Sequence, residues 1–298
     1  MPVPEKPNVV YILTDQWRAK ATGYNGDPNV VTPNIDRLAT ECLDFVNAIS
    51  TSPVCTPARA ALLTGRFPTT TGVFMNDIPL SPDESSIGKV FKSGGYETAY
   101  IGKWHVDGHG RANYIPPERR QGFDYWKVLE CTHDYQNSEY YEGDDSTIKM
   151  WDGYDAFAQT DDACAYIRQH REKPFFLTLS LGPPHFPHNN APGEFQTRFV
   201  PEDIRFSANV VFDDPEFEAF TRKEAAGYYA HIAALDGCVG SVVETLKASG
   251  LEESTILIFA SDHGEMMGSH RQTPYKKQIF WDESCRVPYL LRYSPLTL

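Results

Sequence analysis

The amino-acid sequence predicts an α/β protein in which a large, mostly parallel β-sheet is sandwiched between helices. Short apolar runs rich in β-branched residues recur along the chain, and such runs are typical of strands buried on both faces. Segments with apolar residues at helical spacing lie between them. Strands that alternate with helices favour parallel pairing, because each helix carries the chain back across the sheet.

The individual elements follow in chain order. We predict strands at residues 8–15, 97–103, 174–181, 254–262 and 287–292. Residues 34–45 place Ile35, Leu38 and Cys42 at spacings of three and four, so we predict a helix with Cys42 in the core. Residues 224–250 form a longer helical pattern that ends at a glycine, which is a good stop signal.

Composition and charge narrow the classes of function. The chain has 298 residues, of which 41% are hydrophobic and 22% are charged, as in ordinary globular proteins. Its net charge of −13 argues against nucleic acid as a partner. No apolar run approaches the roughly 20 residues that span a membrane, and the start of the chain does not resemble a signal peptide, so we expect a cytoplasmic protein with no membrane partner. The 6 cysteines lack metal-site or disulfide spacing.

Polar residues gather where predicted strands end, which is where α/β proteins place their active residues. Acids, an amide, an imidazole and a lysine come from strand ends far apart in the sequence: Asp15, Gln16, Lys103, His105, Asp262 and His263. Two acids with an amide and an imidazole would suit a divalent cation. The alternative is that the two aspartates only cap the helices that follow.

Cys55 stands in the stretch "SPVCTPARAALLTGRFP". Pro57 suits the first turn of a helix, so we expect Cys55 just before that helix, where free N–H groups favour negative charge. Arg59 lies one turn further on the same side. This predicts an anion site around a reactive side chain. Two other interpretations are a phosphatase-like thiolate, which lacks the usual glycine-rich donors here, and a packed cysteine beside a helix cap.

The stretch "CTPARAALLTGR" resembles the sulfatase signature, in which the cysteine is oxidised enzymatically to formylglycine. The resemblance continues over nearly the whole chain, in "PNVVYILTDQW", "TPNIDRLA", "GKWH", "PFFLTLSLGPPHFPH", "SDHGEMMGSH" and "CRVP". It points to the sulfatase branch of the alkaline-phosphatase-like superfamily. That branch implies the sandwiched sheet, hydrolysis of sulfate monoesters, and a formylglycine-generating enzyme as a partner.

The resemblance also implies a metal site. It assigns Asp15, Gln16, Asp262 and His263 to the metal, with modified Cys55 as a further ligand. Members of the family often have a second aspartate where this chain has Gln16, which removes one negative charge. Calcium is the metal that the resemblance implies first, and magnesium and manganese stay open because an imidazole suits calcium poorly.

The remaining site residues are also implied by the resemblance. Arg59 and Lys103 would hold the nucleophile, and His105, His185 and Lys277 would contact the sulfate or the leaving oxygen. Hydrated formylglycine carries two hydroxyls on one carbon. One hydroxyl would attack sulfur and displace the alcohol, which takes up a proton. Deprotonation of the second hydroxyl, by a base such as His105, would then expel sulfate and regenerate the aldehyde.

Two further functions fit the same residues. A phosphonate monoester or phosphodiester hydrolase shares this fold and can share the metal set, and Asn76 could serve either chemistry. A catalytically silent protein would bind an anion without turnover if Cys55 stayed unmodified. We expect residues 1–298 to form a single catalytic domain without the smaller C-terminal subdomain that sulfatases usually have, and residues 134–157 to be either a wall of the cleft or a surface loop.

Overall fold

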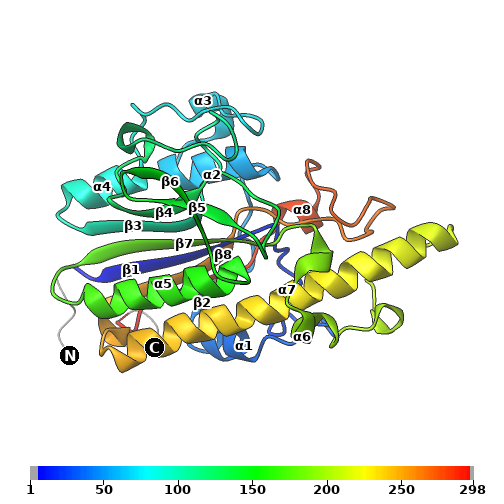
Figure 1. The fold of residues 1–298 in the computed structure, drawn as a ribbon. Helices are drawn as coiled ribbons and strands as arrows, with labels where there is room; N and C mark the ends of the chain where they lie inside the picture. Colours follow the sequence, from blue (N-terminus) through cyan, green and yellow to red (C-terminus); the bar gives the residue numbers. More distant parts are fainter. Residues whose placement is uncertain (1–5, 296–298) are drawn as a thin grey trace.

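The computed structural model describes residues 6–295 and builds them around one nine-stranded sheet (Figure 1). In spatial order the strands are β2 (Leu43–Asp44), β9 (Tyr289–Arg292), β8 (Thr255–Ser261), β1 (Asn8–Asp15), β7 (Phe175–Pro184), β3 (Glu97–Lys103), β4 (Tyr125–Leu129), β5 (Glu139–Glu142) and β6 (Asp145–Met150). The α/β class predicted from the sequence is therefore confirmed.

The centre of the sheet is parallel and its two edges are antiparallel. β8, β1, β7, β3 and β4 pair in parallel, and their side chains are mostly buried on both faces, as their apolar runs predict. β9 and β2 extend one edge in antiparallel pairing, and β5 and β6 extend the other. The strand predicted at residues 287–292 forms as β9, but it runs against its neighbour β8.

Helices cover both faces of the sheet (Figure 1). One face carries α1 (Pro33–Ala39), α5 (Asp155–Gln169) and α7 (Pro215–Ala248), and the other carries α2 (Cys55–Thr64), α3 (Pro68–Thr71) and α4 (Ile87–Ser93). Short helices are α6 (Gly193–Gln196) and α8 (Asp282–Cys285), with 3₁₀ turns at Pro117–Arg119, His188–Asn190, Pro201–Asp203 and Glu252–Ser254. Adjacent residues of a strand pack into the hydrophobic cores on opposite faces of the sheet. Val10 packs with the α5 and α7 layer, and Val9 packs with the α2 and α4 layer.

Three sequence predictions need correction. The first helix ends at Ala39, so Cys42 lies beyond it and is only partly buried against the core. The long helix begins at Pro215, nine residues before the apolar pattern becomes clear, because Asp214 caps it and accepts a hydrogen bond from the Glu216 N–H. Residues 134–157 contain the β5–β6 hairpin, so the interpretation as a surface loop is wrong, and their role as a wall of the cleft stays a prediction.

All cysteines lie in the described residues, and none of them forms a disulfide there. Within residues 6–295, the helices are too short or too polar to cross a membrane.

The start of α1 is held by a side chain from α7. Thr32, at the N-cap position, makes no capping hydrogen bond of its own. Instead the buried Asp236 carboxylate accepts from the backbone N–H groups of Asn34, at 3.1 Å, and Ile35, at 2.8 Å. One carboxylate thus satisfies the free donors at the helix start and joins two helices.

We predict that Asp236→Ala lowers the free energy of unfolding by about 1–3 kcal/mol, because two buried N–H groups lose their acceptor. Urea unfolding monitored by circular dichroism measures the change. Asp236→Asn, which keeps one acceptor oxygen, should lose less. Equal stability of Asp236→Ala and the unchanged chain would contradict the role.

Candidate active site

The carboxyl ends of the parallel strands and the start of α2 meet at one buried site. All the residues that the sequence analysis named for catalysis or metal binding lie there or at its rim, and nearly all are fully buried: Asp15, Gln16, Cys55, Arg59, Lys103, His105, His185, Asp262, His263 and Lys277. The parallel arrangement brings them together, because it places all these strand ends at the same edge of the sheet.

Cys55 is the first residue of α2, whereas the sequence analysis placed it just before the helix. The N-cap residue Val54 offers no side-chain acceptor, and the cap comes from elsewhere: Asn76 Oδ1 accepts from the Thr56 N–H at 3.0 Å. Asn76, whose role the sequence left open, therefore caps this helix. The cap fixes the position from which Cys55 points into the site.

Four buried side chains form a compact group of possible metal ligands. One ligand atom each from Asp15, Cys55, Asp262 and His263 lies within 4.8 Å of the others. His263 Nδ1 faces the Gly264 carbonyl at 2.9 Å and donates to it, so Nε2 carries the lone pair and points at the group. Buried carboxylates and a thiolate at this spacing need positive charge between them, so the residues fit a divalent cation.

The side-chain amide of Gln16 lies between Lys277 and Glu265. Its Oε1 accepts from Lys277 Nζ at 2.9 Å, and its Nε2 donates to Glu265 Oε2 at 3.0 Å. The two ends of an amide are nearly equal in shape, so only the partners decide which end faces a cation. Glu265, which the sequence analysis did not single out, holds the oxygen end toward the metal ligands. Gln16 also has a φ of 69°, a strained backbone conformation for a residue with a side chain.

Arg59 and Lys103 pair with the carboxylates and not with Cys55 itself. Arg59 donates to Asp262 Oδ2 at 2.9 Å and to Asp15 Oδ2 at 3.3 Å, and Lys103 Nζ lies 2.6 Å from Asp15 Oδ2. Burial favours neutral Asp15, but Lys103 and other nearby cations hold the pKa of its carboxyl far below the usual range. These contacts orient the carboxylates that face the metal position.

Lys277 and His185 stand on the other side of Cys55. Lys277 Nζ lies 3.1 Å from Cys55 Sγ and 2.8 Å from His185 Nε2. His185 Nδ1 donates to the Phe186 carbonyl at 2.7 Å, so Nε2 is free to accept from Lys277. Burial and the charge of Lys277 lower the pKa of His185 to about 3, which keeps this imidazole neutral.

The charges around Cys55 favour its anionic form. Burial opposes ionisation, yet the charges of Lys277 and Lys103 hold the pKa of the thiol well below its usual range. The Cys55 Sγ lies 3.2 Å from His263 Nε2 and 3.6 Å from Asp15 Oδ1. An atom at this position is therefore surrounded by donors and positive charge, and in a modified residue the same position would hold an oxygen.

Two histidines line the side of the site next to Cys55. His105 has a φ of 57°, and burial together with Lys103 lowers the pKa of its imidazole. His133, from the loop after β4, stacks on His185 with ring centroids 4.7 Å apart. His133 was missed in the sequence because it stands in an acidic, aromatic segment with no recognisable motif.

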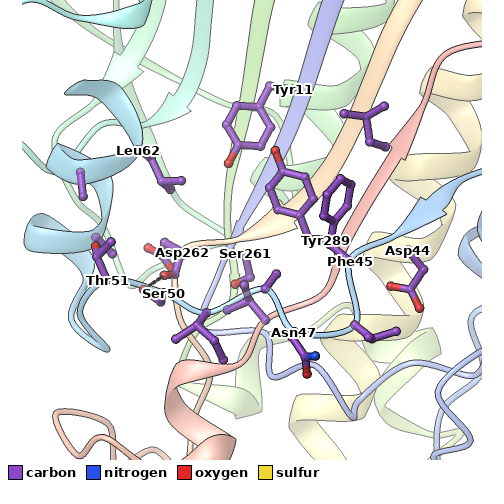
Figure 2. A pocket seen from close by; sticks show the side chains of 17 residues that line it. Tyr11, Asp44, Phe45, Asn47, Ser50, Thr51, Leu62, Ser261, Asp262 and Tyr289 are labelled. Carbon is purple, nitrogen blue, oxygen red and sulfur yellow. Dashed lines mark hydrogen bonds between the residues drawn. The ribbon is translucent and has the colours of Figure 1, made fainter. Parts of the chain in front are cut away.

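An apolar groove lies next to the site but is separate from it (Figure 2). Its cavity of about 590 Å³ is lined by Phe45, Leu62 and Tyr289, and Cys55 is not among its lining residues. Asp262 reaches its wall through the backbone carbonyl, which accepts a hydrogen bond from Ser50. An apolar lining does not suit a sulfate group, so the groove is not the catalytic pocket.

The fold and the site together define an α/β protein of the alkaline-phosphatase-like class with a buried cysteine among possible metal ligands. The family model named Sulfatase matches residues 7–297, and the chain belongs to the sulfatase family. It is 51% identical over 292 residues to the ulvan-active sulfatase of Formosa agariphila, an alignment that covers 97% of this chain and 57% of that relative.

Solved structures support the same fold. The yidJ protein of Bacteroides fragilis superposes with a TM-score of 0.90 at 31% identity, over 98% of this chain and 69% of its own. The phosphonate monoester hydrolase of Agrobacterium radiobacter superposes with a TM-score of 0.78 at 23% identity, over 97% and 68% of the two chains. At that identity the second likeness concerns the fold alone.

We predict that Glu265→Gln weakens divalent-cation binding by about tenfold or more, the effect typical of removing a group that orients a metal ligand. The substituted amide offers Gln16 a donor as well as an acceptor, so it no longer fixes the Gln16 oxygen toward the metal position. Calorimetric titration with calcium, magnesium and manganese measures the affinity without requiring turnover.

The matched control is Glu252→Gln, since Glu252 contacts Arg292 at 3.0 Å, just before the start of β8 and far along the strand from the site. Combining Gln16→Glu with Glu265→Gln should recover affinity, because residue 16 then offers oxygen at both positions. Unchanged cation affinity in Glu265→Gln would show that Glu265 does not orient Gln16.

Proposed function

We propose that this chain is the catalytic part of a sulfatase that hydrolyses sulfate monoesters on a carbohydrate, with formylglycine at position 55 as the nucleophile. The chain spans 57% of its ulvan-active relative, so the activity of the whole protein is part of this proposal. The observation that carries it is the position of Cys55 at the start of α2, with Lys277, His263 and Asp15 around its Sγ.

The residues around position 55 have separate roles in this proposal. Hydrated formylglycine would supply a hydroxyl nucleophile. Asp15, Gln16, Asp262 and His263 would hold a divalent cation, whose charge would favour the deprotonated form of that hydroxyl. Arg59 and Lys103 fix the carboxylates and add positive charge where the sulfate oxygens gather. His105 is the base that we assign to the second hydroxyl, since burial keeps its imidazole neutral and able to accept a proton.

Lys277 is the proton donor that we assign to the leaving oxygen. His185 accepts a hydrogen bond from Lys277 and stays neutral at physiological pH, because its pKa is lowered to about 3. A neutral imidazole whose Nδ1–H is bound to a backbone carbonyl has no proton to give at Nε2. His185 therefore positions Lys277, and His133 packs against the outer face of His185.

The substrate class rests on the similarity to the ulvan-active sulfatase, and a sulfated polysaccharide is the class that we propose. Calcium is the metal that we propose first, with magnesium and manganese as alternatives. A formylglycine-generating enzyme is the partner that conversion of Cys55 requires. The cytoplasmic location expected from the sequence stays a prediction.

A phosphonate monoester or phosphodiester hydrolase is the second candidate. The pairing of Asp15 with Gln16, in place of two aspartates, favours it, because this pairing gives the metal one negative charge fewer. The cations near position 55 argue for sulfate monoesters, since a monoester has more unesterified oxygens that need donors than a diester has. A second organic arm would leave some of these donors unpaired.

We predict that a metal-loaded, formylglycine-containing preparation prefers an aryl sulfate over the matching phosphonate monoester and phosphodiester. The measurement is kcat/KM for the three compounds on one sample. If kcat/KM for a phosphorus substrate exceeds that for the aryl sulfate by more than about tenfold, or roughly 1.4 kcal/mol in the transition state, the second candidate replaces the sulfatase proposal.

We also predict that Lys103→Ala lowers turnover of a sulfate ester by about a hundredfold to a thousandfold, the range for losing one preorganised charged donor. Lys127→Ala is the matched control. Lys127 is a partly buried lysine on β4 whose Nζ lies 2.5 Å from Asp162 Oδ1, and this ion pair is not part of the site. Similar turnover in the two variants would refute the role of Lys103.

A further inference from the structure

Arg18 is a buried cation without a matching anion. It lies three residues after β1, is 7% exposed, and its backbone N–H donates to the Tyr228 hydroxyl at 3.0 Å. Its guanidinium makes one long contact, at 3.5 Å from Nη2 to the Tyr229 hydroxyl, and its Nε has no hydrogen-bond partner among residues 6–295. Within the same residues Arg18 forms no ion pair with a carboxylate. Buried charges are normally paired, so this guanidinium has unused capacity for an anion.

The nearest acids are already occupied. Asp27 Oδ1 accepts from the Asn29 N–H and Nδ2 at 2.9 Å each, and Asp27 Oδ2 accepts from the Tyr229 hydroxyl at 2.9 Å. Glu265 Oε2 accepts from Gln16 on the side of the metal ligands. Neither carboxylate lies within ion-pair distance of Arg18, although both influence it through space.

Arg18 lines a surface hollow that carries an excess of positive charge. The hollow encloses about 230 Å³, and Lys20 and Arg205 stand on its rim, with Asn25 and Ser207 as further polar groups. Asp27 is its acidic lining residue. Such a local excess stands out in a chain whose net charge is −13. The volume is sufficient for a sulfate or carboxylate group and part of the sugar that carries it.

We propose that this hollow, lined by Arg18, Lys20 and Arg205, is an oxyanion-binding site separate from the catalytic centre. A planar guanidinium at the floor can bind two oxygens of a sulfate or carboxylate, and the two rim cations can reach the others. The anion comes either from solution or from a second anionic group on the substrate. The second source rests on the proposed function, whereas the binding site itself does not.

The hollow is coupled to the catalytic centre through the backbone. Arg18 follows Gln16 by two residues, and a side chain added at Gly264, next to His263, would meet the Arg18 Cα at 3.1 Å. The chain that carries Arg18 thus packs directly against the chain that carries a metal ligand. A substrate with several anionic groups could engage both places at once.

Calorimetric titration of the intact chain with sodium sulfate, and separately with sodium acetate, tests the site without requiring turnover. Arg205→Ala should weaken the anion-binding step assigned to the hollow by about tenfold or more. Lys92→Ala is the matched control, because it removes the same charge from α4 on the other face of the sheet. If Arg205→Ala and Lys92→Ala bind sulfate with the same affinity, and acetate likewise, the proposal is overturned.

Arg18→Met gives a second and independent readout. If Arg18 binds the anion in the hollow, the variant should lose the part of the sulfate-dependent rise in melting temperature that this site contributes. It should also match the unchanged chain in stability when no anion is present, since an unpaired buried charge has been removed. A variant that is destabilised without anion and keeps the full sulfate-dependent rise shows a structural Arg18 and contradicts the proposal.

Kinetics then distinguish the two sources of the anion. If the hollow binds the substrate, Arg205→Ala should raise KM for a sulfated oligosaccharide with a second anionic group and leave KM for an aryl sulfate unchanged. If both KM values stay unchanged while anion binding falls, the hollow takes a free anion. Absence of sulfatase activity in every preparation would count against the proposed function, and the binding result would still decide on the hollow.

Discussion

The buried pairing of Arg59 with Asp15 and Asp262 is the interaction on which the site depends. These groups come from α2, β1 and the end of β8, and none of them is exposed to water by more than 1%. Charges this deeply buried are stable only when they are paired. Because one arginine on α2 pairs with both aspartates, the ends of β1 and β8 must be adjacent and α2 must begin beside them. Lys103 on β3 extends the same pairing to Asp15 and ties a third strand to it. The position of Cys55 one helical turn before Arg59 then follows from the helix geometry.

Support from outside the site keeps this arrangement precise. Asn76 caps α2 in place of Val54, Glu265 fixes the amide of Gln16, and His185 holds Lys277. Gln16 and His105 are held with positive φ, a conformation that persists only where the surroundings enforce it. Each support comes from a segment distant in sequence from the residue that it holds. These contacts position the charged groups of the site without any help from a substrate, which suits a reaction that relies on fixed charges.

The sequence predicted the parts that depend on local pattern or on motif. The buried strands were recognisable because parallel strands are apolar on both faces, and the residues assigned to the site, except Lys277, lay in stretches that resemble sulfatases. It did not predict Glu265 or His133, because their roles depend on contacts with Gln16 and His185 that only folding creates. The strand at β9 was predicted, but its antiparallel direction was not, because strand direction is set by connections and not by composition. The β5–β6 hairpin was missed altogether. Nor did it indicate that Arg18 is buried without an anion, since that depends on where Asp27 finds its partners.

The chemical identity of residue 55 tests the account most directly. The chain should be produced with and without a formylglycine-generating enzyme, and the peptide that contains residue 55 should be measured by mass spectrometry beside sulfatase activity on the same samples. The account predicts that the peptide loses the mass of a thiol and gains that of an aldehyde only in the first sample, and that turnover rises in proportion to the converted fraction. Full activity in a sample in which Cys55 is entirely unmodified, or in Cys55→Ala, would contradict it.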